Sequence, residues 1–251
     1  MNSSRSRRVR EFYRESYRML QLEVTAAANG KVQGQSPEPL GVLGADAPRE
    51  HGANIQRQGG LTLLVTSSVR EEGKSVVAAN LAISMSQTGR KVLLVDADCR
   101  NPVQHKLLDL DVQTGLMDLL AGNIGWNDAV KKTSIDNLCA ITSGVEQAAS
   151  LLEGGNIQPD PSALLISPHL EDFIKSLREQ FNVIIFDSTS ATLASEPAAI
   201  GSKVDGVVLV IKANDTRKDI VLRAKQRMQS SGGNILGAVL NCASVEKRFY
   251  K

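Results

Sequence analysis

The sequence is poor in aromatic residues, in cysteine and in long apolar runs. Its 251 residues include one Trp, three Tyr and five Phe, and its three cysteines, Cys99, Cys139 and Cys242, are far apart and form no CxxC pair. This pattern argues against a disulfide framework or a cysteine metal site and is typical of small buried thiols in a reducing compartment. No apolar run approaches the ~20 residues of a membrane span, and no secretory signal follows the N-terminal arginines. We therefore expect a cytoplasmic protein.

Charge is nearly balanced over the whole chain, at +2, but it is unevenly distributed. Residues 1–18 hold six arginines and two glutamates, a local charge of +4, whereas the rest of the chain carries 23 basic and 25 acidic residues. A basic tip on a nearly neutral body is typical of peripheral contact with an anionic membrane or an acidic partner, although a solvated helix end has the same pattern. No basic stripe follows, so we expect no nucleic-acid partner.

Apolar spacing divides the chain into four parts. Residues 7–27 place Val9, Tyr13, Tyr17, Leu20 and Val24 at helical intervals and predict an amphipathic helix. We therefore assign 1–27 to a basic N-terminal helix. Residues 28–60 are rich in Gly, Pro, Gln and Ala without periodicity and are typical of a flexible linker. The main domain is expected over 61–241, and a C-terminal tail over 242–251.

Apolar strands alternate with helices throughout 61–241. The strands are predicted at 61–66, 91–96, 137–142, 183–187, 206–212 and 235–241, and the helices at 74–88, 114–121, 161–180, 194–202 and 216–231. Continuous Val, Ile and Leu runs indicate strands buried on both faces, as in a parallel sheet with helical crossovers. The predicted fold class is therefore α/β, a mostly parallel sheet with flanking helices.

The segment SVREEGKS (68–75) joins the first strand to the first helix of this domain. A phosphate-binding loop belongs at that place, because backbone N–H groups and the helix dipole at a helix N-terminus attract phosphate. Lys74 would reach the β- and γ-phosphates of a nucleotide, and the Ser75 hydroxyl would bind Mg²⁺. Ser68 replaces the first glycine of the GxxxxGK[ST] pattern, so the match is incomplete.

Two predicted strands end in aspartate. KVLLVDADCRNP (91–102) carries Asp96 and Asp98, and FNVIIFD (181–187) ends at Asp187. Ligands of open parallel sheets bind at the carboxyl ends of the strands, so these side chains should lie near the phosphate loop. Carboxylates suit Mg²⁺, and Asp96 or Asp98 could accept a proton from an attacking hydroxyl. The sequence thus predicts an ATP and Mg²⁺ site.

Three segments, 66–75, 92–102 and 183–187, resemble the Walker A, Walker A′ and Walker B motifs of bacterial tyrosine kinases (BY-kinases). Together with 114–122, 159–187 and 205–216, they resemble the cytoplasmic polysaccharide-biosynthesis kinases of the CpsD/CapB type. The resemblance covers nearly the whole chain apart from the linker. It implies a P-loop NTPase fold (SIMIBI-like) and an ATP-dependent protein-tyrosine autokinase that regulates exopolysaccharide or capsule synthesis and export.

The resemblance also implies roles for individual residues. Lys74, Asp96 and Asp98 are the expected catalytic residues, and Ser75, Asp96 and Asp187 are the expected metal ligands. Nucleotide contacts are expected from eight residues of the phosphate loop and the last strand: Ser67, Ser68, Glu72, Gly73, Lys74, Ser75, Val76 and Asn241.

Both chain ends carry further expectations. The segment ESYRMLQ (15–21) resembles a family helix implicated in ring assembly, which implies oligomerisation through Glu15 and Arg18, although these two residues could equally form an intrahelical pair. Tyr250 is the expected phosphoacceptor, because the ten residues from Cys242 to Lys251 can extend roughly 35 Å from the carboxyl edge of the sheet. The resemblance favours transfer between subunits. It also implies a membrane-spanning chain-length regulator as activator, which would hold the protein at the inner face of the plasma membrane.

The chain departs from the family pattern in ways that leave alternatives open. Arg70 and Glu71 stand where the family has Pro-Gly, Gln21 replaces an arginine of the N-terminal motif, and the tail after Asp187 is Ser-Thr-Ser instead of Thr-Pro-Pro. One alternative is a nucleotide-binding regulatory scaffold of a polysaccharide-export complex without phosphotransfer. A partitioning-type ATPase is another, but those proteins carry a second lysine where this chain has Val69.

Overall fold

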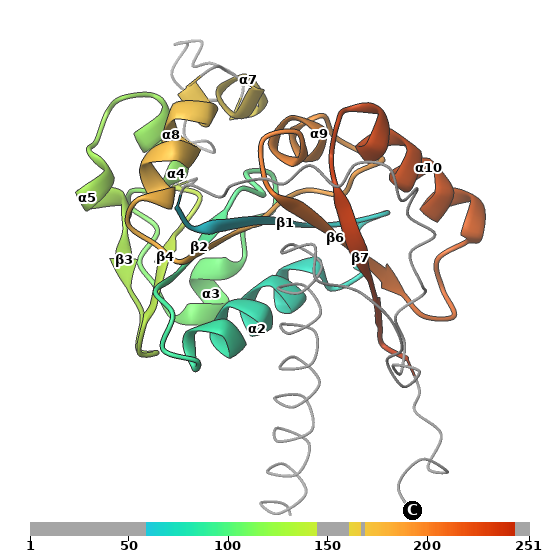
Figure 1. The fold of residues 1–251 in the computed structure, drawn as a ribbon, viewed down its shortest axis with the longest axis horizontal. Coiled ribbons are helices and arrows are strands. Elements are labelled where there is room, and N and C mark those ends of the chain that lie inside the picture. The colour runs from blue at the N-terminus through green and yellow to red at the C-terminus, as the bar shows by residue number, and fades with distance from the viewer. Residues whose placement is uncertain (1–58, 145–160, 167–168, 244–251) are drawn as a thin grey trace, which may run out of the picture.

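The computed structural model describes residues 59–144, 161–166 and 169–243. The predicted N-terminal helix, most of the predicted linker and nearly all of the predicted tail lie outside these ranges. Within them, seven strands and eight helices follow one another along the chain (Figure 1). They are β1 (Leu61–Ser67), α2 (Lys74–Ser86), β2 (Val92–Asp96), α3 (Gln104–Leu108), α4 (Leu116–Leu120), α5 (Trp126–Ala129), β3 (Lys131–Lys132), β4 (Leu138–Ile141), α7 (Pro161–Ile166), α8 (His169–Arg178), β5 (Val183–Asp187), α9 (Glu196–Gly201), β6 (Gly206–Lys212), α10 (Lys218–Ser230) and β7 (Ile235–Asn241).

The strands form one sheet in the order β3-β4-β2-β5-β1-β6-β7. All neighbouring pairs are parallel except β3 with β4, where a two-residue strand adds an antiparallel edge. The predicted mostly parallel α/β fold is therefore confirmed. Because the parallel strands run the same way, the carboxyl ends of β1, β2, β5, β6 and β7 meet at one edge of the sheet.

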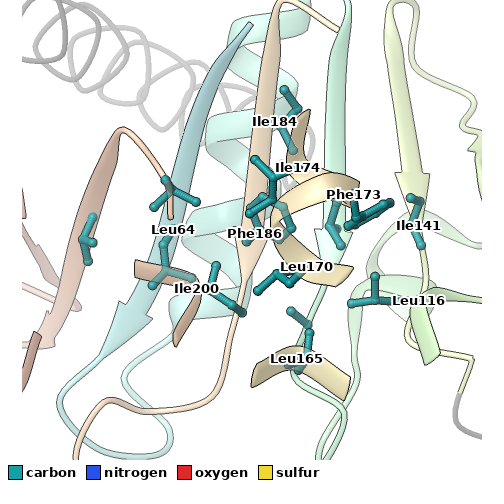
Figure 2. Close-up of a cluster of buried hydrophobic side chains, with 14 of the residues drawn as sticks. Leu64, Leu116, Ile141, Leu165, Leu170, Phe173, Ile174, Ile184, Phe186 and Ile200 are labelled. Atoms are coloured by element: carbon teal, nitrogen blue, oxygen red, sulfur yellow. The ribbon is translucent and has the colours of Figure 1, made fainter. Parts of the chain in front are cut away.

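Helices cover both faces of the sheet, so the central strands are apolar on both sides, as their Val, Ile and Leu runs predict. In Figure 1, α2 and α3 lie below the sheet, and α8, α9 and α10 lie above it. On the α2 side, Leu63, Val65 and Leu94 pack with Leu81 and Met85. On the other side, buried side chains of strands and helices form a second cluster. Figure 2 labels ten of its residues: Leu64, Leu116, Ile141, Leu165, Leu170, Phe173, Ile174, Ile184, Phe186 and Ile200.

Some elements differ from the sequence-based expectation. The helix predicted over 161–180 is two helices, α7 and α8, and the sequence between them contains Pro168. Proline has no N–H and disfavours helical backbone at the preceding residue, which explains the division. The elements α3, α5 and β3 were not predicted, because two to five residues are too few to show a periodic pattern. In the part of the chain that is described, no helix has the length and apolar character of a membrane span.

An ion-pair network secures the amino edge of the sheet, opposite the strand ends that carry the aspartates. The Arg178 guanidinium donates to both carboxylate oxygens of Asp205, at 2.9 and 3.1 Å, and also to Gly60 O and Thr62 Oγ1. Asp205 in turn accepts from the Thr62 N–H at 2.7 Å. These contacts connect α8, the start of β1 and the turn before β6.

Candidate active site

The segment between β1 and α2 is shaped as a phosphate-binding loop. It turns into α2 at Lys74, and Gly73 just before it has a φ of 85°, in the left-handed region that glycine adopts at little cost. A Cβ on Gly73 would lie 2.1 Å from Asn241 Nδ2, so a larger residue would push the Asn241 side chain out of its present position. The backbone N–H groups at the start of this 13-residue helix provide a partial positive charge for an anion.

The buried side chain of Glu72 fastens this loop to the last strands of the sheet. Its carboxylate accepts hydrogen bonds from the Val69 N–H at 2.8 Å, the Lys212 N–H at 3.2 Å and the Thr216 hydroxyl. The Glu72 carbonyl accepts a further bond, at 2.8 Å, from Asn241 Nδ2. The carboxylate and Asn241 therefore hold the loop in shape, which leaves the backbone N–H of Glu72 as its group for a phosphate.

Lys74 pairs with a carboxylate from the loop that follows β2. Its Nζ lies 2.8 Å from Asp98 Oδ2, and the side chain of Asp98 is only 3% exposed. Asp98 Oδ1 accepts from the Asn101 N–H at 3.0 Å, which holds the carboxylate in the loop after β2. The loop lysine and a candidate base are thus in direct contact, and phosphate could compete with Asp98 for the lysine.

The Asp96 carboxylate, at the end of β2, accepts hydrogen bonds from the backbone at the start of α3. Its Oδ2 accepts from the backbone N–H groups of Val103 and Gln104, at 3.1 and 3.0 Å, and its Oδ1 accepts from the Asp98 N–H at 3.3 Å. Burial raises the pKa of Asp96 well above its ordinary value, and the negative charge of Asp187 adds to the increase. Both oxygens are engaged, so Asp96 shapes the loop that carries Asp98.

Asp187 lies beside Asp96 in the sheet register, at the end of β5. Its Oδ2 accepts from Gln104 Nε2 at 2.8 Å, whereas Oδ1 is buried and has no hydrogen-bond partner within the described residues. Burial raises the pKa of Asp187 to about 6, although the positive charge of Lys74, the hydrogen bond from Gln104 and the nearby Ser75 side chain act against the increase.

This arrangement fits Mg²⁺. The unpartnered Asp187 Oδ1 and the nearby Ser75 hydroxyl are hard oxygen ligands, which this ion prefers. Among the residues described, no three acidic, histidine or cysteine side chains could hold a metal by themselves. An ion that takes its other ligands from phosphate and water, as Mg²⁺ does, needs no such cluster.

Hydroxyl groups line the loop at its junction with the tail of β5. Ser67 Oγ donates to Val69 O at 2.6 Å and lies 3.1 Å from Ser190 Oγ. The Thr192 hydroxyl donates to Ser68 O at 2.6 Å, while Ser68 Oγ is buried without a partner among the described residues. The Ser-Thr-Ser tail that departs from the family pattern thus takes part in holding the loop.

The structure brings most of the predicted site residues to one edge of the sheet. Contacts or sheet register connect Lys74 with Asp98, Asp96 with Asp187, and Asn241 with the loop. Val76 lies on α2 with 48% of its surface exposed. The predicted roles of Tyr250, Glu15 and Arg18 concern positions outside the described residues.

Sequence reasoning missed Gln104, Thr192 and Thr216. Gln104 contacts Ser75 O and Asp187, Thr192 contacts the loop carbonyl of Ser68, and Thr216 contacts Glu72. A signal existed only for Gln104, which is a polar residue soon after the aspartate motif in NPVQH (101–105). The two threonines lie more than 120 residues from their partners in the loop.

The sheet, the loop and the two aspartate-tipped strands define a P-loop nucleotide-binding protein, and residues 71–216 match the AAA domain family. The tyrosine-protein kinase CpsD of Streptococcus agalactiae is 35% identical over 181 residues, which cover 71% of this chain and 74% of that protein. The tyrosine-protein kinase YwqD of Bacillus subtilis is 32% identical over 195 residues, covering 78% and 77%.

A solved structure agrees with these relatives. The kinase domain of the Escherichia coli tyrosine kinase ETK superposes with a TM-score of 0.67 at 26% identity, covering 75% of this chain and 70% of that one. The chain therefore belongs to the bacterial tyrosine-protein kinase family. The predicted family and the predicted P-loop fold are both confirmed.

Proposed function

We propose that this chain is an ATP-dependent protein-tyrosine kinase that phosphorylates other copies of the same chain and regulates exopolysaccharide or capsule synthesis. The observation that carries the proposal is the contact of Lys74 with Asp98 at the edge where Asp187 ends β5. The loop lysine, a carboxylate for the proton and a carboxylate for the metal are thus side by side. The link to polysaccharide synthesis rests on the family resemblance.

In the proposed reaction, Lys74 leaves Asp98 and neutralises the β- and γ-phosphates of ATP, together with the N–H groups at the start of α2. The tyrosine oxygen bonds to the γ-phosphorus, the bond from that phosphorus to the bridging oxygen breaks, and ADP leaves. Asp98 accepts the phenolic proton. It is the better acceptor of the two aspartates, because both oxygens of Asp96 already accept backbone hydrogen bonds.

Magnesium would be held by Ser75 and Asp187, with Asp96 supporting the loop. When bound, the ion neutralises charge on the transferring phosphoryl group. The nucleotide would also contact the backbone of Ser67, Ser68, Glu72 and Gly73, the side of Val76, and the region of Asn241. Most of this catalysis is positioning and charge neutralisation, so an altered loop can still support it.

The acceptor that we propose is Tyr250, modified by a neighbouring subunit of a homo-oligomer. The last strand ends at Asn241, at the same edge as Lys74, so a tail of ten residues can reach either its own site or an adjacent one. Glu15 and Arg18 are the proposed assembly residues. We expect Arg18→Ala to reduce the oligomer mass in light scattering, whereas an unchanged mass would remove this role.

We also propose that a membrane-spanning chain-length regulator activates the protein and keeps it at the inner face of the plasma membrane. This part rests on the family resemblance and on the basic N-terminus. Adding the cytoplasmic segment of such a regulator to the purified protein should raise the rate of labelling. A rate that is unchanged at saturating segment would count against the activator.

Radiolabelled ATP and phosphoamino-acid analysis test the proposed reaction. Purified protein should yield labelled phosphotyrosine, and Lys74→Met should abolish it. Lys91→Met is the matched control, because Lys91 is exposed and precedes β2 at the opposite edge of the sheet. Lys74-dependent ATP binding without phosphotyrosine would refute the kinase and support the regulatory scaffold.

A further inference from the structure

Gln104 joins all three nucleotide-binding segments of the site. It is the first residue of α3 and is completely buried. Its Nε2 donates to Asp187 Oδ2 at 2.8 Å and to the carbonyl oxygen of Ser75 at 2.9 Å. Its backbone N–H donates to Asp96 Oδ2 at 3.0 Å. One residue therefore connects the end of β5, the first turn of α2 and the end of β2.

The chemistry of its partners determines the orientation of the Gln104 amide. A backbone carbonyl and an ionised carboxylate can only accept, so the NH₂ group must face both Ser75 O and Asp187 Oδ2. The amide oxygen must then point elsewhere. Gln104 Oε1 is buried and finds no donor among the described residues, as is also the case for Asp187 Oδ1.

Two buried acceptors without donors are costly, since each forfeits a hydrogen bond that water would supply. Such groups are explained when a ligand supplies the missing partner. Mg²⁺ keeps several of its own water molecules in protein sites, and these offer hydrogens to nearby acceptors. Residues that hold a metal ligand by a hydrogen bond also tune metal affinity, typically by a factor of about 10–100.

We propose that Gln104 is a positioning residue for Mg²⁺ at the nucleotide site. Its NH₂ group holds Asp187 and the first turn of α2 in register, and its Oε1 accepts a hydrogen bond from the hydration shell of the ion. The inference rests on the nucleotide-binding part of the proposed function and does not require phosphotransfer.

The alternative is that Gln104 only fills space and supports the fold. The two roles differ in how ADP binding responds to Mg²⁺. A supporting residue would change ADP affinity equally with and without the ion. A positioning residue would change mainly the factor by which Mg²⁺ tightens ADP binding.

The test measures ADP dissociation constants of the full chain by calorimetry, with Mg²⁺ and with a chelator. Gln104→Met keeps side-chain length and removes both the donor and the acceptor. We expect its tightening factor to fall at least about tenfold, while the affinity without Mg²⁺ stays within about threefold of the parent. Gln113→Met is the matched control, because Gln113 is exposed and lies outside the site. It should behave as the parent.

A tightening factor within about twofold of the parent in Gln104→Met would overturn the inference, as would an equal loss with and without Mg²⁺. If Gln104→Met does not unfold cooperatively and so is not properly folded, Gln104→Asn is measured in its place and judged by the same criteria. Its amide is one methylene shorter and cannot reach both Ser75 O and Asp187. If the tightening factor depends on Gln104 but the unsubstituted chain forms no phosphotyrosine, only the proposed kinase activity is refuted. If the unsubstituted chain forms phosphotyrosine but the tightening factor does not depend on Gln104, only this inference is refuted.

Discussion

Replacement of Glu71 by glycine should make this protein more stable. Glu71 lies in the phosphate loop with a φ of 63°, a left-handed conformation that side chains with a Cβ rarely adopt. Its side chain is exposed and makes no hydrogen bond or close ion pair with the residues that the structure describes. Glu71→Gly therefore removes backbone strain at little cost in contacts. The family pattern that this chain resembles has glycine at this position.

The size of the effect follows from two opposing terms. Left-handed backbone costs a residue with a Cβ about 1–2 kcal/mol. Glycine gives the unfolded chain more freedom, which costs about 0.5–1 kcal/mol. The net gain should be about 0.5–1 kcal/mol, or roughly 1–4 °C in Tm for a domain of this size. Loss of one carboxylate should also tighten ATP binding at least about twofold, as expected for a unit charge ~10 Å away in water.

Urea denaturation of Glu71→Gly and Arg70→Gly provides the assay. Arg70 is the adjacent exposed residue, and its φ is not positive. Arg70→Gly should therefore lower the free energy of unfolding by about 0.4–1 kcal/mol. If Glu71→Gly destabilises the protein as Arg70→Gly does, the strain assigned to Glu71 is wrong.

Two further predictions concern buried charges. Arg178→Ala should lower the free energy of unfolding by about 3 kcal/mol, because it removes the cation of the largely buried Asp205 side chain. Lys175→Ala, at an exposed pair, should cost less than about 1 kcal/mol. A similar loss in both variants would contradict the network. Because burial raises the pKa of Asp187 to about 6, its protonated form favours folding. This contribution, about 3 kcal/mol, is fully present below pH ~4 and is lost as the pH rises through about 6. Urea denaturation at several pH values should show the loss in the nucleotide-free parent, and Asp187→Asn should reduce it. An equal slope in Asp187→Asn would refute the assignment.

The sequence predicted the framework of the site well. Continuous apolar runs locate β1, β2, β5, β6 and β7, because strands covered on both faces must be apolar throughout. Polar residues at the ends of such strands converge in a parallel sheet. Lys74, Asp96, Asp98 and Asp187 could therefore be selected before their contacts were known.

The supporting contacts could not be predicted in the same way. In the sequence, Glu72 is a loop residue that could contact a nucleotide, yet its carboxylate accepts a hydrogen bond from Thr216, 144 residues away. Gln104 belongs to a five-residue helix that has too few positions to show periodicity. Both contacts depend on how distant strands lie next to each other in the sheet, and no local pattern in the sequence contains that information.

Mixing a chain without a working nucleotide site with a chain without the proposed acceptor tests the central claim most directly. A Lys74→Met chain, which should not bind phosphate, is combined with a Tyr250→Phe chain, which has an intact site and no proposed acceptor. With radiolabelled ATP, the account predicts phosphate on Tyr250 of the Lys74→Met chain. No labelled tyrosine in the mixture, or label on Tyr250 only when Lys74 is intact in the same molecule, would contradict it.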